Sequence, residues 1–254
     1  MQMSNELNDD QLLQFSRQIM LPQIDITGQQ KLLTARVLIL GVGGLGCPLL
    51  MYLAGCGVGK IVIVDPDVIE LSNLQRQVLF DLHDVGRNKV DVAKEKIQQS
   101  NPQVQITTRT YIPDDDELIS LIEDTDVVID GTDNFAARYR HNQFCLNSKT
   151  PLVSGAVIRF EGQVTTFDHR NSASPCYHCL YPQGQEQDLN CTENGVMGPV
   201  AGMIATIMAT EVVKLITNSG ELLTGRLFLV DALHMECRTV RFEKDPQCLV
   251  CANA

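Results

Sequence analysis

Residues 37–46 read VLILGVGGLG, an apolar run followed by a turn that matches G-x-G-x-x-G and contains Gly41, Gly43, Gly44 and Gly46. The apolar run is typical of a strand buried on both faces. Glycines in such a turn let the backbone approach a phosphate chain, and the following helix offers unpaired N–H donors and the positive end of its dipole. The next apolar run ends at Asp65, where a carboxylate accepts hydrogen bonds from a ribose. The stretch therefore predicts a nucleotide site and leaves the kind of nucleotide open.

On both sides of this turn, short apolar runs and longer amphipathic segments follow one another up to about residue 150. The expected strands are 37–40, 61–64, 104–108, 127–129 and 151–154, and the expected helices are 8–21, 44–57, 89–99, 115–122 and 134–146. A loop with Pro22 and Gly28 is expected between the first helix and the first strand. Strands that alternate with helices predict an α/β fold of the Rossmann-like, doubly wound kind, with a mainly parallel sheet covered on both faces.

The pattern changes after Pro151. Residues 160–167 alternate apolar and polar side chains, which is typical of an antiparallel strand with one buried face. Residues 168–195 are rich in Asn, Ser, Pro, Gly and Gln and predict a long functional loop. An apolar helix at about 197–216 and strands at 227–231 and 238–242 are expected to follow. We predict one domain over 1–254, with a nucleotide-binding half at 1–150 and a half at 151–254 that recognises a partner and binds zinc.

Composition limits the class of partner. The 254 residues carry a net charge of -11 and a pI near 4.8, which disfavours binding to nucleic acid. The N-terminus has no apolar core that would suit a signal peptide. Residues 194–210 carry no charge but form a shorter stretch than a membrane span needs, so a buried helix is expected there rather than a membrane segment. These features predict a cytoplasmic protein.

Polar side chains follow the second expected strand, where residues 65–77 read DPDVIELSNLQRQ. An arginine and a lysine near a phosphate-binding turn suit the binding of a triphosphate. The alternative is that both are surface cations with no role at the site. The residues expected at the nucleotide site here are Asp65, Asp67, Ser72, Asn73, Gln75, Arg76 and, at the start of the next helix, Lys89. The chain has no G-x-x-x-x-G-K-[ST] motif, so P-loop chemistry is not indicated.

Residues 127–134 read VVIDGTDN and place acidic side chains at the end of another strand. The carboxyl ends of neighbouring strands meet at one crevice, so these acids belong beside the same nucleotide. A carboxylate there suits magnesium, which binds one or two carboxylates together with phosphate oxygens. The alternative is a role as N-cap of the helix that begins near Phe135, and the two roles can coexist.

Four of the nine cysteines form two C-x-x-C pairs, Cys176 with Cys179 and Cys248 with Cys251. Two such pairs complete an all-thiolate tetrahedral zinc site, which predicts a structural zinc ion that staples the C-terminal tail to the long loop. Two redox pairs are the alternative, but neither pair precedes an expected helix.

The other cysteines have different surroundings. Cys191 lies in the polar loop, where it is either a nucleophile, a persulfide carrier or an incidental thiol. Four cysteines fall in expected helices or strands and are expected to be small core residues. They are Cys47, Cys56, Cys145 and Cys237.

Taken together, these motifs resemble the ThiF/MoeB family, bacterial relatives of the ubiquitin-activating enzymes. The matching segments are FSRQI at 15–19, the glycine turn at 41–46, SNLQRQ at 72–77, TDN at 132–134, VSGA at 153–156, GVMGP at 195–199 and both cysteine pairs. They follow the family order over nearly the whole chain.

The resemblance implies ATP-dependent adenylylation of the C-terminal glycine carboxylate of a ubiquitin-like sulfur-carrier protein that ends in Gly-Gly. Gly44 and Asp65 would then contact ATP. The triphosphate would be positioned by Asn73, Arg76 and Lys89, and magnesium would be held by Asp133 beside Asn134. Arg17 would reach the active site of the other subunit of a homodimer. The carrier tail would enter beneath the loop that contains Cys191, whose covalent role the resemblance leaves open. The adenylate would then accept sulfur from a separate donor protein such as a cysteine desulfurase, since no fused rhodanese domain is expected in this chain.

The family motifs do not choose between ThiS-type carriers of thiamine biosynthesis and MoaD-type carriers of molybdopterin synthesis. Two functions from other classes remain as alternatives. A NAD-dependent oxidoreductase would explain the glycine turn and Asp65, but it would leave Arg76, Lys89 and Asp133 without a role. A non-catalytic zinc-stapled module that binds a ubiquitin-like partner would not need those three side chains at one crevice.

Overall fold

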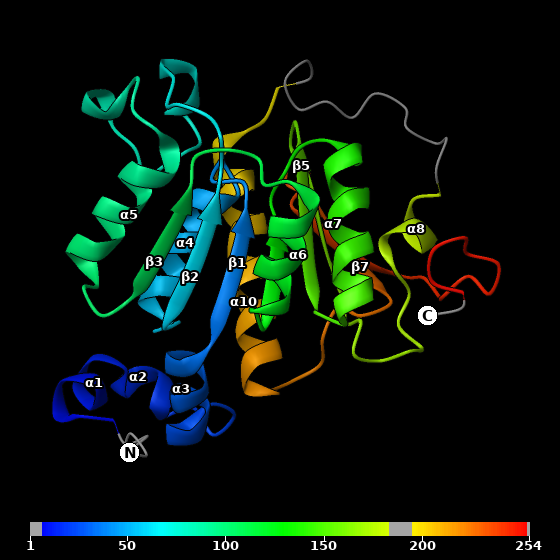
Figure 1. Ribbon diagram of the computed structural model, residues 1–254, viewed down its shortest axis with the longest axis horizontal. Helices are drawn as coiled ribbons and strands as arrows, with labels where there is room; N and C mark the ends of the chain where they lie inside the picture. The colour runs from blue at the N-terminus through cyan, green and yellow to red at the C-terminus, as the bar shows by residue number, and fades with distance from the viewer. Residues whose placement is uncertain (1–6, 183–194, 253–254) are drawn as a thin grey trace.

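The computed structural model describes residues 7–182 and 195–252, which build an eight-stranded sheet in the order β3-β2-β1-β4-β5-β6-β7-β8 (Figure 1). The strands are β1 Arg36–Leu40, β2 Lys60–Val64, β3 Gln105–Arg109, β4 Val127–Asp130, β5 Leu152–Ile158, β6 Glu161–Phe167, β7 Arg226–Asp231 and β8 Glu236–Arg241. The first five strands pair in parallel, and β6, β7 and β8 continue the sheet in antiparallel fashion. The predicted fold class is therefore confirmed.

Alternate residues of each central strand enter two separate cores. Val37 and Ile39 of β1 belong to the larger core, beneath α4 (Gly46–Gly55), α5 (Lys89–Ser100) and α10 (Gly198–Thr217). Leu38 and Leu40 belong to the other core, beneath α6 (Asp115–Glu123) and α7 (Phe135–Ser148). In Figure 1, α6 and α7 lie in front of the sheet and α4 and α10 lie behind it. This two-sided burial explains why the strands are continuous apolar runs.

Helix α10 is long and apolar enough, by length and composition, to cross a membrane. However, 56% of its most apolar window is buried inside the protein, where the helix packs on α4, β5 and β6. Its buried Glu211 accepts hydrogen bonds from the Thr166 hydroxyl (2.8 Å) and the Leu223 backbone N–H (2.7 Å), which fixes the helix to its neighbours. It is the core helix that the sequence predicts.

The N-terminal region differs from the expectation. The single helix expected at 8–21 is divided into α1 (Asp9–Gln14) and α2 (Ser16–Ile19), and the buried Phe15 lies between them. The expected loop with Pro22 and Gly28 is wrong, because α3 (Asp25–Thr34) occupies most of it. Gly28 lies inside α3 as a packing residue: a Cβ there would be 3.2 Å from Ile24 Cγ2 and 3.4 Å from Thr217 Cγ2.

The C-terminal half also holds two corrections. The expected loop at 168–195 contains a short helix, α8 (Tyr177–Leu180), in its described part. Cys237 is exposed on the edge strand β8, and Cys56 is only half-buried, so neither is a core residue, whereas Cys47 and Cys145 are buried as expected. Burial raises the pKa of the Cys47 thiol to about 12, which makes it unreactive. Two 3₁₀ turns, Leu71–Asn73 and Leu82–Asp84, complete the connections.

Candidate adenylylation site and metal centre

The chain reverses its direction across the sheet between β1 and β4, which are neighbours, and a crevice opens at their carboxyl ends. Gly41 has a φ of +93°, which only glycine adopts without strain, and a Cβ there would lie 3.2 Å from the backbone of Gly131. The glycine turn after β1 therefore touches the turn after β4. A cavity of about 790 Å³ lies against both turns.

This cavity brings together most of the residues predicted at the nucleotide site. It is lined by Gly41, Gly43, Gly44, Asp65, Asp67, Asn73, Arg76, Lys89, Asp133 and Asn134. Its wall also contains an apolar side that the sequence reading missed, formed by Ile112, Pro113, Leu118 and Ala137, which suits a flat base. Gln77 was missed as well. It is 2% exposed, lines the cavity, and its Oε1 has no hydrogen-bond partner.

Asp65 ties the glycine turn to the end of β2. Its Oδ2 accepts the Val42 N–H at 2.7 Å and its Oδ1 accepts the Asp67 N–H at 2.9 Å. Burial raises the pKa of the Asp65 carboxyl, and the nearby Lys89 charge and these two backbone hydrogen bonds oppose that rise. The carboxylate thus shapes the turn from within and also lines the cavity.

Two cations converge on the same turn. The Lys89 ammonium is buried, 2.7 Å from Asp67 Oδ2 and 3.9 Å from Asp65 Oδ1. The Arg76 guanidinium donates to the Ser72 carbonyl at 3.2 Å, and its side chain passes so close to Gly44 that a Cβ there would be 3.1 Å from Arg76 Cγ. Both positive groups therefore lie where phosphates would approach the glycines.

At the end of β4, a buried contact between a carboxylate and an imidazole supports the second turn. Asp130 is 1% exposed, and its Oδ2 lies 2.8 Å from His141 Nδ1. Burial alone would raise the pKa of the Asp130 carboxyl, but the neighbouring His141, the Arg138 charge and the Thr132 hydrogen bond lower it to about 2. The sequence reading did not single out Asp130, His141 or Arg138, because the pairing depends on how α7 packs against β4.

Asp133 follows this turn and lies differently. Asn134, the next residue, is the N-cap of α7, and its Oδ1 accepts the Ala137 N–H at 2.8 Å. The capping role therefore falls to Asn134. The Asp133 carboxylate is exposed and makes no hydrogen bond or ion pair with any other part of the chain that the structure describes. It is a carboxylate without a protein partner at the edge of the cavity.

A second cavity of about 390 Å³ adjoins the first. The residues that line both cavities are Asp133, Asn134, Arg138, Ala156 and Val157. The aromatic wall of the second cavity comes from Phe135, Tyr177 and Tyr181, and the Gln163 amide donates to the Tyr181 hydroxyl at 2.5 Å. Asp133 thus stands at the point where a ligand in one cavity would meet a ligand in the other.

Four of the predicted residues lie outside the nucleotide cavity. Gly46, Ser72 and Gln75 are not among the residues that line it. Arg17 is exposed on α2, which lies at the opposite, N-terminal edge of the sheet (Figure 1). Within one chain Arg17 therefore cannot reach the cavity. Cys191 falls within 183–194, outside the described residues.

Gly46 has a packing role that we expect to be sensitive to substitution. A Cβ at Gly46 would lie 2.1 Å from the Gly41 carbonyl oxygen, a backbone atom that cannot move aside without distorting the glycine turn. Gly46→Ala is therefore expected to lower the free energy of unfolding by about 1–3 kcal/mol, measured by chemical denaturation.

Gly202→Ala is the matched control, because Gly202 lies in α10 and a Cβ there would meet no atom within 4 Å. The free energy of unfolding of this variant is expected to rise by about 0.5–1 kcal/mol. Equal stability of the two variants would contradict the close approach of the two glycines.

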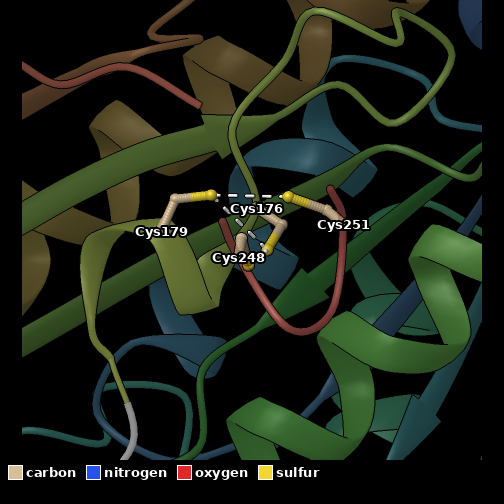
Figure 2. A group of neighbouring side chains, drawn as sticks. All are labelled: Cys176, Cys179, Cys248 and Cys251. Atoms are coloured by element: carbon tan, nitrogen blue, oxygen red, sulfur yellow. Dashed lines mark hydrogen bonds between the residues drawn. The ribbon is translucent and has the colours of Figure 1, made fainter. Parts of the chain in front are cut away.

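The two C-x-x-C pairs meet, as predicted, although their segments are far apart in the sequence (Figure 2). The sulfur atoms of Cys176 lie 3.9 Å from Cys179 and 3.8 Å from Cys248, and those of Cys179 and Cys251 lie 3.4 Å apart. Four sulfurs held tetrahedrally at about 2.3 Å from a zinc ion would lie about 3.8 Å apart. The four thiols therefore fit a closed zinc site.

The first cysteine pair differs from the expectation in one respect. Cys176 is the N-cap of the short helix α8 and Cys179 lies within it, so this pair stands at the start of a helical turn. This helical turn nevertheless gives little support to two redox pairs over a metal site. The four sulfurs all lie within 4.8 Å of one another, and the backbone N–H of Asp245 donates to Cys179 Sγ at 3.4 Å. Four grouped sulfurs fit the ligands of one metal ion, and the N–H donor fits the hydrogen bonds that metal ligands commonly accept from the surrounding protein.

With this geometry in place, comparison with known proteins identifies the family. The ThiF family model matches residues 15–250. The chain belongs to the ThiF family. A molybdopterin-synthase adenylyltransferase of Salmonella typhimurium is 42% identical over 248 residues, which cover 98% of this chain and 99% of that protein. A SAMP-activating enzyme E1 of Haloferax volcanii is 41% identical over 253 residues, 99% of this chain and 93% of that protein.

Solved structures agree with this assignment. A crystal structure of Escherichia coli MccB with ATP has a TM-score of 0.78 and 25% sequence identity, and the match covers 89% of this chain and 69% of that one. The two proteins therefore share one fold over 89% of this chain.

Proposed function

We propose that this ThiF-family protein adenylylates the C-terminal glycine carboxylate of a ubiquitin-like sulfur carrier of the MoaD type, which ends in Gly-Gly. The observation that carries the proposal is the junction of the two cavities at Asp133. The larger cavity suits ATP, and the smaller one suits the extended end of a protein tail. High identity over the full length of a molybdopterin-synthase adenylyltransferase favours the MoaD-type carrier over the ThiS type.

In the proposed reaction, a carboxylate oxygen of the carrier attacks the α-phosphorus of ATP, the bond between the α-phosphorus and the bridging oxygen breaks, and pyrophosphate leaves. No protein nucleophile is needed, because positioning and charge neutralisation can carry phosphoryl-type transfer. The Gly41–Gly46 turn and the N-terminus of α4 would hold the phosphates. Arg76 and Lys89 would neutralise the charge that develops on the leaving pyrophosphate.

Magnesium, bound by Asp133 and phosphate oxygens, would supply further neutralisation of the triphosphate. The exposed carboxylate without a partner fits such a ligand. For Lys89 to reach a phosphate, its ion pair with Asp67 must loosen. Asp67 is exposed, so its carboxylate can turn to water while the phosphate becomes the new partner of the buried Lys89 ammonium.

The alternatives are less consistent with the site. A nicotinamide-dependent oxidoreductase has no use for Lys89, Arg76 and Asp133 at one cavity, and a binding module does not need a nucleotide cavity at all. The adenylyltransferases among the relatives do not favour either alternative.

The remaining assignments belong to the same proposal. The four cysteines would hold a structural zinc ion. Cysteines that bind a metal rather than form disulfides suit the reducing cytoplasm. Arg17, at the far edge of the sheet, would act in the partner subunit of a homodimer, where an exposed cation can complete a neighbouring site. Sulfur would reach the adenylate from a separate donor protein, and Cys191 stays a candidate for a covalent step.

The decisive test is ATP–pyrophosphate exchange with purified carriers of both types. Exchange is expected with a MoaD-type carrier, because the reaction up to the adenylate is reversible and needs only ATP, magnesium and the carrier tail. A carrier that lacks its last two glycines is the control and is expected to give no exchange. Exchange with the ThiS type alone would reassign the carrier, and hydride transfer to NAD without exchange would refute the proposal.

A further inference from the structure

The buried pair formed by Asp130 and His141 is not explained by the proposed chemistry, because neither side chain is needed to bind ATP or to neutralise phosphates. Asp130 is 1% exposed and His141 is 6% exposed. A buried pair of polar side chains is weak evidence for stability, since well-packed apolar residues often serve equally well. Its position beside the nucleotide cavity, which His141 lines, suggests a role at that cavity.

The two oxygens of Asp130 serve different elements. Oδ2 contacts His141 on α7 at 2.8 Å, whereas Oδ1 accepts both the N–H (2.9 Å) and the hydroxyl (2.5 Å) of Thr132. The carboxylate therefore connects α7 to the turn after β4. The imidazole fixes one carboxylate oxygen, and the other oxygen accepts the two hydrogen bonds that hold the turn.

A second side chain of α7 also forms hydrogen bonds with the same turn. Arg138, one helical turn before His141, donates from Nε to the Thr132 carbonyl at 3.1 Å and from Nη2 to the Gly155 carbonyl at 2.9 Å. On the other side of Asp133, Asn134 caps α7. The residues before and after Asp133 are thus both fixed to α7, while the Asp133 carboxylate itself points to no protein partner in the described chain.

We propose that His141 is a positioning residue for Asp133: through Asp130 and Thr132 it holds the turn that presents the Asp133 carboxylate to magnesium. The inference rests on the proposed adenylylation and deepens it by adding a residue behind the metal ligand. Groups that orient a metal ligand in this way commonly change metal affinity by about 10- to 100-fold when they are removed. His141 would act on the magnesium requirement and not on contacts with the base or ribose.

The test compares the magnesium concentration for half-maximal ATP–pyrophosphate exchange in three variants. His141→Leu removes the contact with Asp130 and is expected to raise that concentration about 10-fold. His141→Asn places an amide N–H near the position of Nδ1 and is expected to restore most of the wild-type value. Thr132→Val removes the hydroxyl contact on the other oxygen of Asp130 and is expected to raise the requirement in the same direction, which provides a second variant should the leucine protein be unstable.

Two further measurements separate positioning from a structural effect. Binding of ATP in the presence of EDTA reports the cavity without the metal and is expected to change much less in His141→Leu than the magnesium requirement does. Asn147→Ala, on the exposed part of α7, controls for weakening of the helix and is expected to keep the wild-type magnesium requirement.

The outcomes are distinguishable. A folded His141→Leu protein with the wild-type magnesium requirement overturns the inference while the proposed function stands. Equal loss of ATP binding in EDTA and of exchange also overturns it, because the effect would then be a general distortion of the cavity. Absence of exchange in the wild-type protein with every carrier would remove the proposed function itself.

Discussion

Asp133→Asn is expected to lower carrier-dependent ATP–pyrophosphate exchange by about 100- to 1,000-fold, because the metal and the charge that it neutralises act directly on the transferring phosphate. The substitution keeps the size of the side chain and removes only the negative charge. Since the carboxylate has no partner among the described residues, its loss breaks no internal contact. The free energy of unfolding is therefore expected to change by less than about 0.5 kcal/mol.

Asp116→Asn is the matched control for this prediction. Asp116 is an exposed acid in the first turn of α6 and lines neither cavity, so the same charge is removed outside the proposed site. This variant is expected to retain wild-type exchange. An Asp133→Asn protein that exchanges pyrophosphate as fast as the control would exclude Asp133 as the magnesium ligand and would leave the role of the unpaired carboxylate without explanation.

The parts of the fold that sequence predicts are those decided by short-range patterns. The run 37–40 and the turn at Gly41–Gly46 specify a buried strand, a close backbone approach and a helix start within ten consecutive residues, and the structure has all three. The pairs Cys176 with Cys179 and Cys248 with Cys251 were predictable for a different reason, since the spacing of metal ligands is a local signature even when two signatures meet across the chain.

What the sequence could not predict depends on packing between distant segments. Gly28 reads as a loop signal, but it lies inside α3 and packs closely there, since a Cβ would be 3.2 Å from Ile24 Cγ2 and 3.4 Å from Thr217 Cγ2 at the end of α10. His141 is one polar residue among several on α7, and only the register of that helix against β4 brings it to Asp130. The wall formed by Tyr177 and Tyr181 depends likewise on where the cysteine cluster fixes α8.

The cysteine cluster and the junction of the two cavities are joined through α8. The Tyr177 N–H, between two of the thiols, donates to the side chain of Asn142 on α7 at 2.9 Å. Burial raises the pKa of the Tyr177 hydroxyl to about 12, although the neighbouring Arg138 charge opposes the rise. Tyr177 lines the second cavity together with Arg138, so loss of the metal beside Tyr177 is expected to disturb this cavity as well as the C-terminal tail.

Cys248→Ser is expected to lose the zinc ion, which in the wild-type protein we expect at one per chain. A structural ion that is present at about 1,000 times its dissociation constant contributes about 4 kcal/mol to the free energy of unfolding. For a chain of this size such a loss lowers Tm by about 8 to 16 °C. Metal analysis of the purified protein and thermal unfolding would check both effects, and exchange is expected to fall with them because the wall at Tyr177 loses its support.

Cys237→Ser separates this effect from the loss of any thiol. Cys237 is exposed on β8 and is not part of the four-cysteine cluster, so the variant is expected to keep its zinc and its Tm. Should Cys248→Ser retain one zinc per chain and unfold at the wild-type temperature, the cluster would not be a metal site, and the redox alternative for the two cysteine pairs would have to be taken up again. If zinc were lost without a change in exchange, the ion would stabilise only the tail, and the wall at Tyr177 would not contribute to exchange.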